Sequence, residues 1–322
     1  MVIGKRNPAA LSSMETTEAL IGPDCGVMTC AVCGTALTRR IAVRLEQCCL
    51  RPCGSCGSWT YFPRSSAATQ ACIHDNADYF DHPYFKLRRS MTAAQRRCRQ
   101  VFTRLSTALE GSSLRGQRVL DIGCDTGTFL KAAQAEFGIV PVGIDVAERA
   151  VNLARQQGIE AYQVRVEEAP SQLADFPAAT AIDLIEHVPE PAEFLEQVRA
   201  RLRPDGILYL ETPNIRSMVY RFGQGLSRLT GGRPAGLIER LFPPQHIQYF
   251  TSSSLRLVAE SAGFEVVRLS ARTLPVSDIA ASPVALAAIG VLQLLDRVFG
   301  TEILLWTVLR RPLSETAPVR HS

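Results

Sequence analysis

The chain has 322 residues, of which 46% are hydrophobic and 20% charged, and its formal net charge is +4. A chain of this length can bury a full α/β core and still carry an additional small module. Its small net charge gives no argument for a polyanionic partner. No basic region followed by an apolar stretch opens the chain, so we expect no signal peptide and a cytoplasmic location. Residues 1–27 are polar and unpatterned, and we expect a flexible extension there.

Ten cysteines are present, and most of them fall between Cys25 and Cys56. Four of these form two Cys-x-x-Cys pairs, Cys30 with Cys33 and Cys53 with Cys56, and a glycine follows each pair. Two pairs at this spacing predict four thiolates around one tetrahedral ion, as in a structural zinc ribbon. Disulfides are the alternative, but the location that we expect keeps thiols reduced. The competing zinc ligands outside the pairs are Cys25, Cys48, Cys49 and His74.

A glycine-rich turn follows the apolar run Arg118–Ile122, which carries Asp121 near its end. A strand that leads into such a turn leaves free backbone N–H groups at the start of the next helix, and these can hold a nucleotide. A second apolar run ends in Asp145, and a carboxylate there can accept hydrogen bonds from both hydroxyls of a ribose. This segment therefore predicts a βαβ unit built around an adenosine-like ligand.

Strand and helix patterns continue to alternate beyond this unit, which indicates an α/β fold. We expect helices over Ala192–Leu202 and up to Ala262, a turn at 203–206, and strands at 207–210, after Gly263 and over Thr301–Arg310.

The glycine turn resembles the first motif of class I S-adenosylmethionine-dependent methyltransferases, usually Asp-x-Gly-x-Gly-x-Gly. Asp125 stands where the middle glycine usually lies, and aspartate tolerates the left-handed backbone that this turn needs. The turn does not match two other nucleotide-binding motifs. A P-loop would end in Gly-Lys-Ser/Thr, and a dinucleotide-binding fold would have the spacing Gly-x-Gly-x-x-Gly. The resemblance implies S-adenosylmethionine as the cofactor. The implied binding residues are Asp121, Gly123, Cys124, Asp125, Gly127, Asp145 and Val146.

Five downstream motifs occur in the order found in small-molecule methyltransferases, such as the ubiquinone-biosynthesis O-methyltransferase and antibiotic-sugar methyltransferases. They are Glu186 to Pro191, Pro204 to Gly206, Glu211 to Asn214, His246 to Phe250, and Ala262 to Val266. The resemblance covers about residues 90–270. It implies a Rossmann-like sheet of strand order 3-2-1-4-5-7-6 with an antiparallel last strand. It also implies methyl transfer to a small molecule or glycan, and we expect an oxygen acceptor.

His187 and His246 are the candidate bases, because histidine titrates near neutral pH. Methyl transfer is an in-line attack on a sulfonium carbon, so the protein must position the acceptor and remove its proton when needed. The resemblance places His187 near the cofactor and His246 toward the acceptor, while Glu186 would orient a histidine or contact the acceptor. For each histidine, a structural role with the ring bonded to the backbone remains the alternative.

A zinc ribbon ahead of a methyltransferase is similar to the arrangement in zinc-ribbon sugar C-methyltransferases and related glycan-cluster enzymes. The aromatic residues from Trp59 to Phe62 and from Tyr79 to Phe85 carry this resemblance. It implies an aromatic linker over the active site. The alternative, in which these residues only dock the ribbon onto the catalytic domain, stays open.

The segment 215–245 is an insertion that we expect to cover the substrate pocket, with a short helix over 218–229. Its arginines could bind a phosphate or carboxylate, but a solvated helix face is the favoured interpretation.

The uncharged run 279–295 is shorter than a bilayer span usually needs. We expect it to form a helix that connects the sixth and seventh strands and packs on the sheet. Peripheral membrane contact or a dimer contact through this run is the alternative.

The chain therefore divides into an extension at 1–27, a zinc ribbon at 28–64, a linker at 65–95, a methyltransferase domain at 96–312 and a tail at 313–322. We expect S-adenosylmethionine and structural zinc as cofactors, and a small-molecule or glycan substrate. Ribosomal RNA methylation is the leading alternative, since one such family also carries an N-terminal zinc site, but the ribbon here shows no basic clustering. A non-catalytic scaffold with a degraded cofactor turn is the second alternative.

Overall fold

The computed structural model describes residues 28–45, 48–62, 87, 89–243, 245–275, 278–279 and 282–313. The extension at 1–27, the aromatic residues Tyr79–Phe85, and most of the linker and the tail lie outside this description. Two competing zinc ligands, Cys25 and His74, also lie outside it, so the expectations about all these segments stay predictions.

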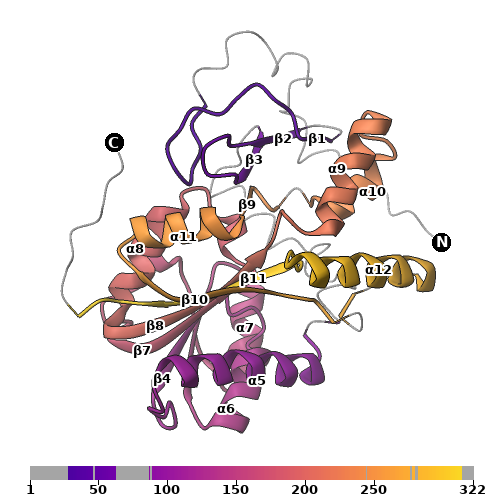
Figure 1. Ribbon diagram of the computed structural model, residues 1–322. Coiled ribbons are helices and arrows are strands. Elements are labelled where there is room, and N and C mark those ends of the chain that lie inside the picture. The colour runs from indigo at the N-terminus through magenta and orange to yellow at the C-terminus, as the bar shows by residue number, and fades with distance from the viewer. Residues whose placement is uncertain are drawn as a thin grey trace.

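A seven-stranded sheet with the order β10-β11-β8-β7-β4-β5-β6 forms the centre of the molecule (Figure 1). Numbered from β4 along the chain, this is the order 3-2-1-4-5-7-6, which confirms the prediction. Neighbouring strands are parallel except for β11, which runs antiparallel to both β8 and β10. The strands are β4 (Arg118–Ile122), β5 (Val140–Asp145), β6 (Glu160–Gln163), β7 (Phe176–Ile182), β8 (Leu202–Pro213), β10 (Glu265–Arg272) and β11 (Leu304–Arg310).

Helices cover both faces of the sheet, because successive strand residues point to opposite faces and both sets are apolar. In β4, Val119 packs in the core formed with α5, α6 and α7, while Leu120 packs in the core formed with α8 and α11. The helices are α5 (Met91–Ala108), α6 (Thr128–Phe137), α7 (Glu148–Gln156), α8 (Pro191–Arg201) and α11 (Ser252–Ser261). Figure 1 shows α5 and α6 on one side of the sheet and α8 and α11 on the other. The helix α5 begins before residue 96, the expected start of the methyltransferase domain.

The turn expected at 203–206 lies inside β8 rather than before it, which corrects the predicted start of this strand. Leu202 already pairs with Phe176, and the register then shifts before Ala178 pairs with Ile207. Asp205 has a φ of 64°, so the chain does bend here, as an irregularity within the strand.

A second, four-stranded antiparallel sheet has the order β1-β2-β3-β9. The strands β1 (Val43–Arg44), β2 (Cys49–Pro52) and β3 (Trp59–Phe62) come from the cysteine-rich region. The fourth strand, β9 (Gln248–Tyr249), comes from the segment after the insertion and pairs with β3 (Figure 1). The ribbon is thus joined to the methyltransferase region by backbone hydrogen bonds, which the sequence did not predict.

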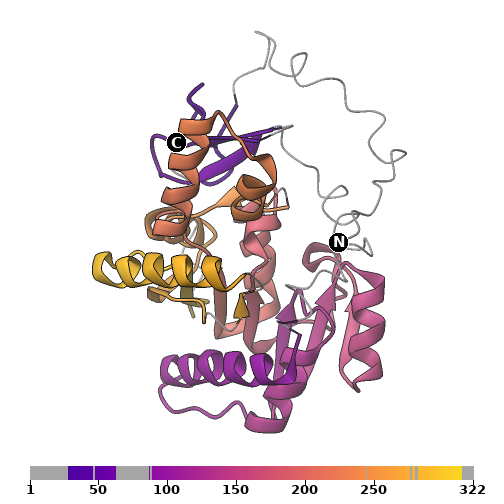
Figure 2. The ribbon, with the colours of Figure 1, turned by 90° about the vertical axis from the view of Figure 1, so that its right-hand side faces the viewer.

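The insertion forms two helices, α9 (Met218–Thr230) and α10 (Ala235–Leu241), which lie beside the ribbon (Figure 2). The helix predicted over 218–229 is confirmed, and it ends at Gly231, whose φ of 66° is the left-handed conformation that glycine adopts readily. The Oγ of Ser227 accepts a hydrogen bond from the backbone N–H of Arg44 at 2.9 Å, so α9 is bound to β1.

The helix α12 (Pro283–Phe299) connects β10 and β11 as predicted, but the expectation that it packs on the sheet is wrong. None of its side chains belongs to the core on either face of the sheet, and its main neighbour is α9. Asp296 accepts hydrogen bonds from the N–H of Met218 at 2.7 Å and from the Oγ1 of Thr301 at 2.8 Å. These bonds turn the polar side of the helix inward. Across the described ranges, no helix is both long and apolar enough to span a bilayer.

Candidate active site and metal centre

A pocket of about 480 Å³ lies at the carboxyl ends of β4, β5 and β7, where open α/β sheets bind their ligands. All the predicted cofactor residues line this pocket except Gly127. They are Asp121, Gly123, Cys124, Asp125, Asp145 and Val146.

Three left-handed residues shape the turn between β4 and α6: Gly123 (φ 76°), Asp125 (φ 47°) and Gly127 (φ 76°). The prediction that Asp125 keeps the left-handed backbone is confirmed, since aspartate adopts it more readily than most residues. Gly127 serves packing instead of lining the pocket. A Cβ at this position would lie 2.9 Å from the Cβ of Ala154 on α7, so the glycine lets α6 and α7 approach each other.

The two strand-end carboxylates of the pocket are held in different ways. Asp145 accepts hydrogen bonds from the backbone N–H groups of Asp125 and Ala147, each at 2.9 Å. Its desolvation by the surrounding protein raises the pKa of Asp145 to about 6. Asp121 is buried and accepts a hydrogen bond from the Oγ1 of Thr180 at 2.5 Å. Burial raises the pKa of Asp121 to about 8 despite this bond.

Three arginines that the sequence did not single out also line the pocket, and two of them pair with acidic residues that are distant in the sequence. Arg89, just before α5, donates two hydrogen bonds to the carboxylate of Asp125, at 2.6 and 2.7 Å. Arg97, on the first half of α5, pairs with Asp183 beyond the end of β7 at 3.4 Å. Both pairs join residues far apart in the sequence, and they meet because the start of α5 lies beside the strand ends. Asp125 has therefore acquired a contact that a glycine could not make.

The three predicted catalytic residues lie together, as a donor or acceptor atom from each of Glu186, His187 and His246 falls within 4.8 Å of the others. Glu186 and His187 are buried on the short 3₁₀ helix η3 (Ile185–His187), which follows β7. The Oε2 of Glu186 accepts a hydrogen bond from the Oγ1 of Thr212 at 2.8 Å. The rings of His187 and His246 meet edge to face, with their centroids 4.8 Å apart.

The hydrogen bond of His187 determines which ring nitrogen can act as a base. Its Nδ1 lies 2.7 Å from the backbone carbonyl of Gln245. A carbonyl oxygen can only accept, so Nδ1 carries the proton and the Nε2 of the neutral ring keeps a lone pair. His187 also lines the pocket at the strand ends. The backbone contact that was the structural alternative thus coexists with a position at the pocket.

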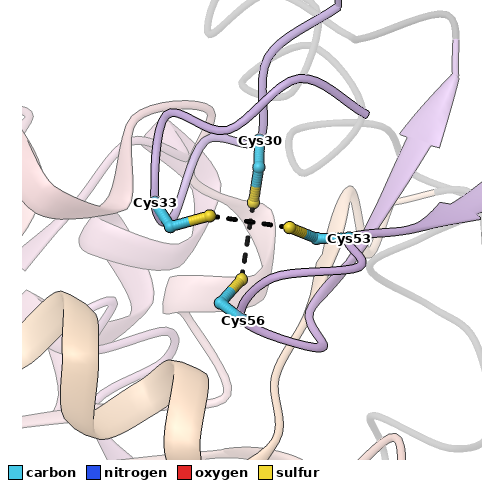
Figure 3. A group of neighbouring side chains, drawn as sticks. All are labelled: Cys30, Cys33, Cys53 and Cys56. Atoms are coloured by element: carbon cyan, nitrogen blue, oxygen red, sulfur yellow. Dashed lines mark hydrogen bonds between the residues drawn. The ribbon is translucent and has the colours of Figure 1, made fainter. Parts of the chain in front are cut away.

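The four paired cysteines form one cluster, as predicted (Figure 3). The sulfur atoms of Cys30 and Cys56 are 3.6 Å apart, and those of Cys33 and Cys53 are 3.5 Å apart. A tetrahedral zinc ion with Zn–S bonds of about 2.3 Å needs sulfur atoms about 3.8 Å apart. The hydroxyl of Ser58 lies 3.0 Å from the sulfur of Cys56 and can support a thiolate there.

The tight turns around the cysteines also fit a zinc ribbon. The N–H of Gly34 bonds to the carbonyl of Cys30, and the N–H of Gly57 bonds to that of Cys53. The two competing ligands that the structure describes, Cys48 and Cys49, lie outside the cluster. The residues present therefore fit a zinc ion held by four thiolates.

Comparison with known sequences places residues 91–269 in a match to the family described as "Methyltransferase domain". The chain is 33% identical over 116 residues to the ubiquinone biosynthesis O-methyltransferase of Haemophilus ducreyi, covering 33% of this chain and 49% of that protein. It is 32% identical over 163 residues to the enzyme of the same name from Bordetella avium, covering 48% and 64%. The chain thus spans about half to two thirds of the length of these relatives.

Among solved structures, the chain is similar to an S-adenosylmethionine-dependent methyltransferase of Thermotoga maritima, described as a possible histamine N-methyltransferase. The TM-score is 0.51 at 16% identity, over 74% of this chain and 99% of that one. Phosphoethanolamine N-methyltransferase 2 of Haemonchus contortus, solved with S-adenosylmethionine, gives 0.50 at 15% identity, over 79% and 62%. At these identities the likeness shows a shared fold and nothing further.

Proposed function

The chain belongs to the methyltransferase-domain family, and on that premise we propose that it transfers a methyl group from S-adenosylmethionine to an oxygen of a small molecule or glycan. The position of His187 carries this proposal, because the residue lines the cofactor pocket and contacts His246. In this proposal, His187 lies between the site of the methyl donor and the site of the acceptor. The ubiquinone-type relatives, which are named as O-methyltransferases, support oxygen as the acceptor atom.

The residues of the pocket suit the parts of S-adenosylmethionine, which supplies an electrophilic methyl group when bound. Asp145 would accept hydrogen bonds from the ribose hydroxyls, because its carboxylate faces the pocket while two N–H groups hold it in place. Asp121 and the backbone around Gly123 would hold the amino-acid end of the cofactor.

His246 is the base that we assign to the acceptor, with Glu186 and His187 beside it. A hydroxyl oxygen is a poor nucleophile until a base takes its proton as the new bond to carbon forms. Glu186 is buried next to the two rings, and an ionised carboxylate at this position would stabilise a histidine that has gained that proton. The hydrogen bond from His187 to the carbonyl of Gln245 holds the His187 ring in place between the acceptor and the cofactor.

A transfer assay with isotopically labelled S-adenosylmethionine tests this function on a panel of phenols, catechols, nucleotide sugars and ribosomal RNA. We expect label in a phenol, catechol or sugar, and His246→Ala should lower turnover by about 10²- to 10⁴-fold, since it removes the base. Affinity for S-adenosylhomocysteine should stay close to that of the wild type. Label in ribosomal RNA alone, or full turnover by His246→Ala, would contradict the proposal.

We also infer that the four-cysteine cluster holds one structural zinc ion per chain. Four thiolates at these separations satisfy zinc fully, leaving no open position for chemistry, so the ion would stabilise the ribbon. A module of this size has too little apolar core to fold without such support.

Metal analysis of protein purified without added zinc should give about one zinc ion per chain. Cys53→Ser should lower this ratio and expose the ribbon to protease, whereas Cys49→Ser, outside the cluster, should change neither. Zinc kept in full after replacement of both Cys30 and Cys33 would show that other residues hold it.

A further inference from the structure

Tyr249 is a buried tyrosine at the junction of the ribbon and the methyltransferase sheet. It lies on β9 opposite Trp59 of the ribbon, and only 1% of its surface is exposed. Its ring packs edge to face on Tyr220 at 5.5 Å and lies 5.8 Å from the ring of His246. Tyr249 therefore lies directly beside the assigned base.

The hydroxyl of Tyr249 has no hydrogen-bond partner among the residues that the structure describes. Buried phenol hydroxyls nearly always have one, because an unmade hydrogen bond in the interior lowers stability. Tyr61, in the same apolar cluster, shows the ordinary arrangement: its hydroxyl donates to the carbonyl of Phe242 at 3.2 Å. The empty bonding capacity of Tyr249 thus needs an explanation that Tyr61 does not.

The surroundings of Tyr249 keep its hydroxyl protonated. Burial raises the pKa of Tyr249 well above its usual range, and the neighbouring Tyr220, Tyr61 and Glu186 raise it further. A protonated phenol can donate a hydrogen bond to an oxygen atom. The strand β9 also contacts η3, which carries Glu186 and His187, so this donor stands beside the residues assigned to the acceptor.

We propose that Tyr249 is a binding residue for the methyl acceptor, and that its hydroxyl donates a hydrogen bond to an oxygen of that acceptor. The assignment rests on the proposed function and adds the side chain that holds the acceptor against His246. Tyr249 forms and breaks no covalent bond and keeps its proton throughout, while His246 takes the proton that the acceptor loses. The unpartnered hydroxyl then finds its partner only when an oxygen-bearing acceptor is bound.

Thermal melting of the empty protein tests the first half of this proposal. Tyr249→Phe removes a hydroxyl that has no partner, so the melting temperature should rise by about 1–4 °C. Tyr61→Phe is the matched control, and it should lower the melting temperature because its hydroxyl has a partner. A fall for Tyr249→Phe as large as that for Tyr61→Phe would overturn the proposal, since the hydroxyl would then have a structural partner.

Transfer kinetics test the second half, with catechol and whichever other phenols or sugars of the panel the wild type methylates. Tyr249→Phe should lower kcat/KM by about 10- to 100-fold, because the acceptor oxygen loses its donor. Its affinity for S-adenosylhomocysteine should stay within about twofold of the wild type, and Tyr61→Phe should keep kcat/KM within a similar factor. Unchanged kcat/KM in Tyr249→Phe would overturn this assignment alone. Failure of the wild type to label any phenol, catechol or sugar of the panel would instead overturn the proposed function.

Discussion

Two helices that each connect strands of the same sheet bury opposite kinds of side chain. Between β4 and β5, α6 buries apolar residues such as Leu130 and Ala133. Between β10 and β11, α12 buries the polar Gln293 and Asp296. The large apolar residues that α12 exposes are Val284, Val291, Leu294, Leu295, Val298 and Phe299.

The difference follows from what anchors each helix. α6 has no side-chain cap and is held by packing between α5 and β5. α12 is held by Asp296, which bonds to the start of α9 and to Thr301 just before β11. Buried hydrogen bonds to a charged group are strong, and they can determine which side of a helix faces inward against the preference of its apolar residues. The apolar run in α12 therefore predicts that a helix forms, but it does not predict which side of that helix is buried.

The largest effect that we expect is at the ion pair between the half-buried Arg272 on β10 and the buried Glu211 on β8. Two hydrogen bonds of 2.6 and 2.8 Å join them, and Tyr209 donates a third to Glu211. Arg272→Met leaves a buried carboxylate without its countercharge and should lower the free energy of unfolding by about 3–5 kcal/mol. Chemical denaturation measures this.

The control for this prediction is Arg256→Met, whose pair with Glu260 is exposed at the surface. Its free energy of unfolding should change by no more than about 0.5 kcal/mol. If Arg272→Met lowered the free energy of unfolding by as little as the control does, the Arg272–Glu211 pair would contribute little to the stability of the sheet.

A smaller effect tests the orientation of α12 directly. Asp296→Ala leaves the N–H of Met218 and the hydroxyl of Thr301 without their acceptor and should cost about 1–3 kcal/mol of unfolding free energy. Leu294→Lys, on the exposed side, should change it by no more than about 0.5 kcal/mol. The reverse ranking in chemical denaturation would mean that the apolar side of α12 is covered by the protein itself.

The smallest effect is a pH dependence at the strand-end pocket. In the proposed site, Asp145 must be ionised to accept hydrogen bonds from both ribose hydroxyls, and burial raises its pKa to about 6. Affinity for S-adenosylhomocysteine should therefore fall as pH drops below that value, by about tenfold at pH 5. Calorimetry across pH 5–8 measures this fall. In Asp145→Asn the contribution of this residue should disappear, and a curve unchanged from the wild type would assign the titration to another group.

The arrangement of the strand-end pocket was largely predictable because its signals are local. Asp121, the glycine turn and Asp145 lie in one βαβ unit, so spacing along the chain indicates their arrangement. The two cysteine pairs are predictable for the same reason, since each Cys-x-x-Cys motif is four residues long. The strand order also followed from the resemblance in the order of the motifs.

The remaining features depend on contacts between distant residues. β9 has two residues, too few for a strand pattern, and only its pairing with β3 reveals it. Arg89 approaches Asp125 because the start of α5 lies beside the strand ends. The distance between the two residues along the sequence does not indicate this contact. The inward side of α12 depends on Met218, which is 78 residues from Asp296. Such features need the fold before they can be seen.

Calorimetric titration of the purified protein with S-adenosylhomocysteine, repeated with Asp145→Ala, tests whether the strand-end pocket binds the methyl donor. We expect one site per chain in the wild type. We also expect a loss of about 2–4 kcal/mol of binding free energy in the variant, because the charge-assisted bonds to the ribose disappear. No binding by the wild type, or equal affinity in the variant, would contradict the assignment of the strand-end pocket to the methyl donor.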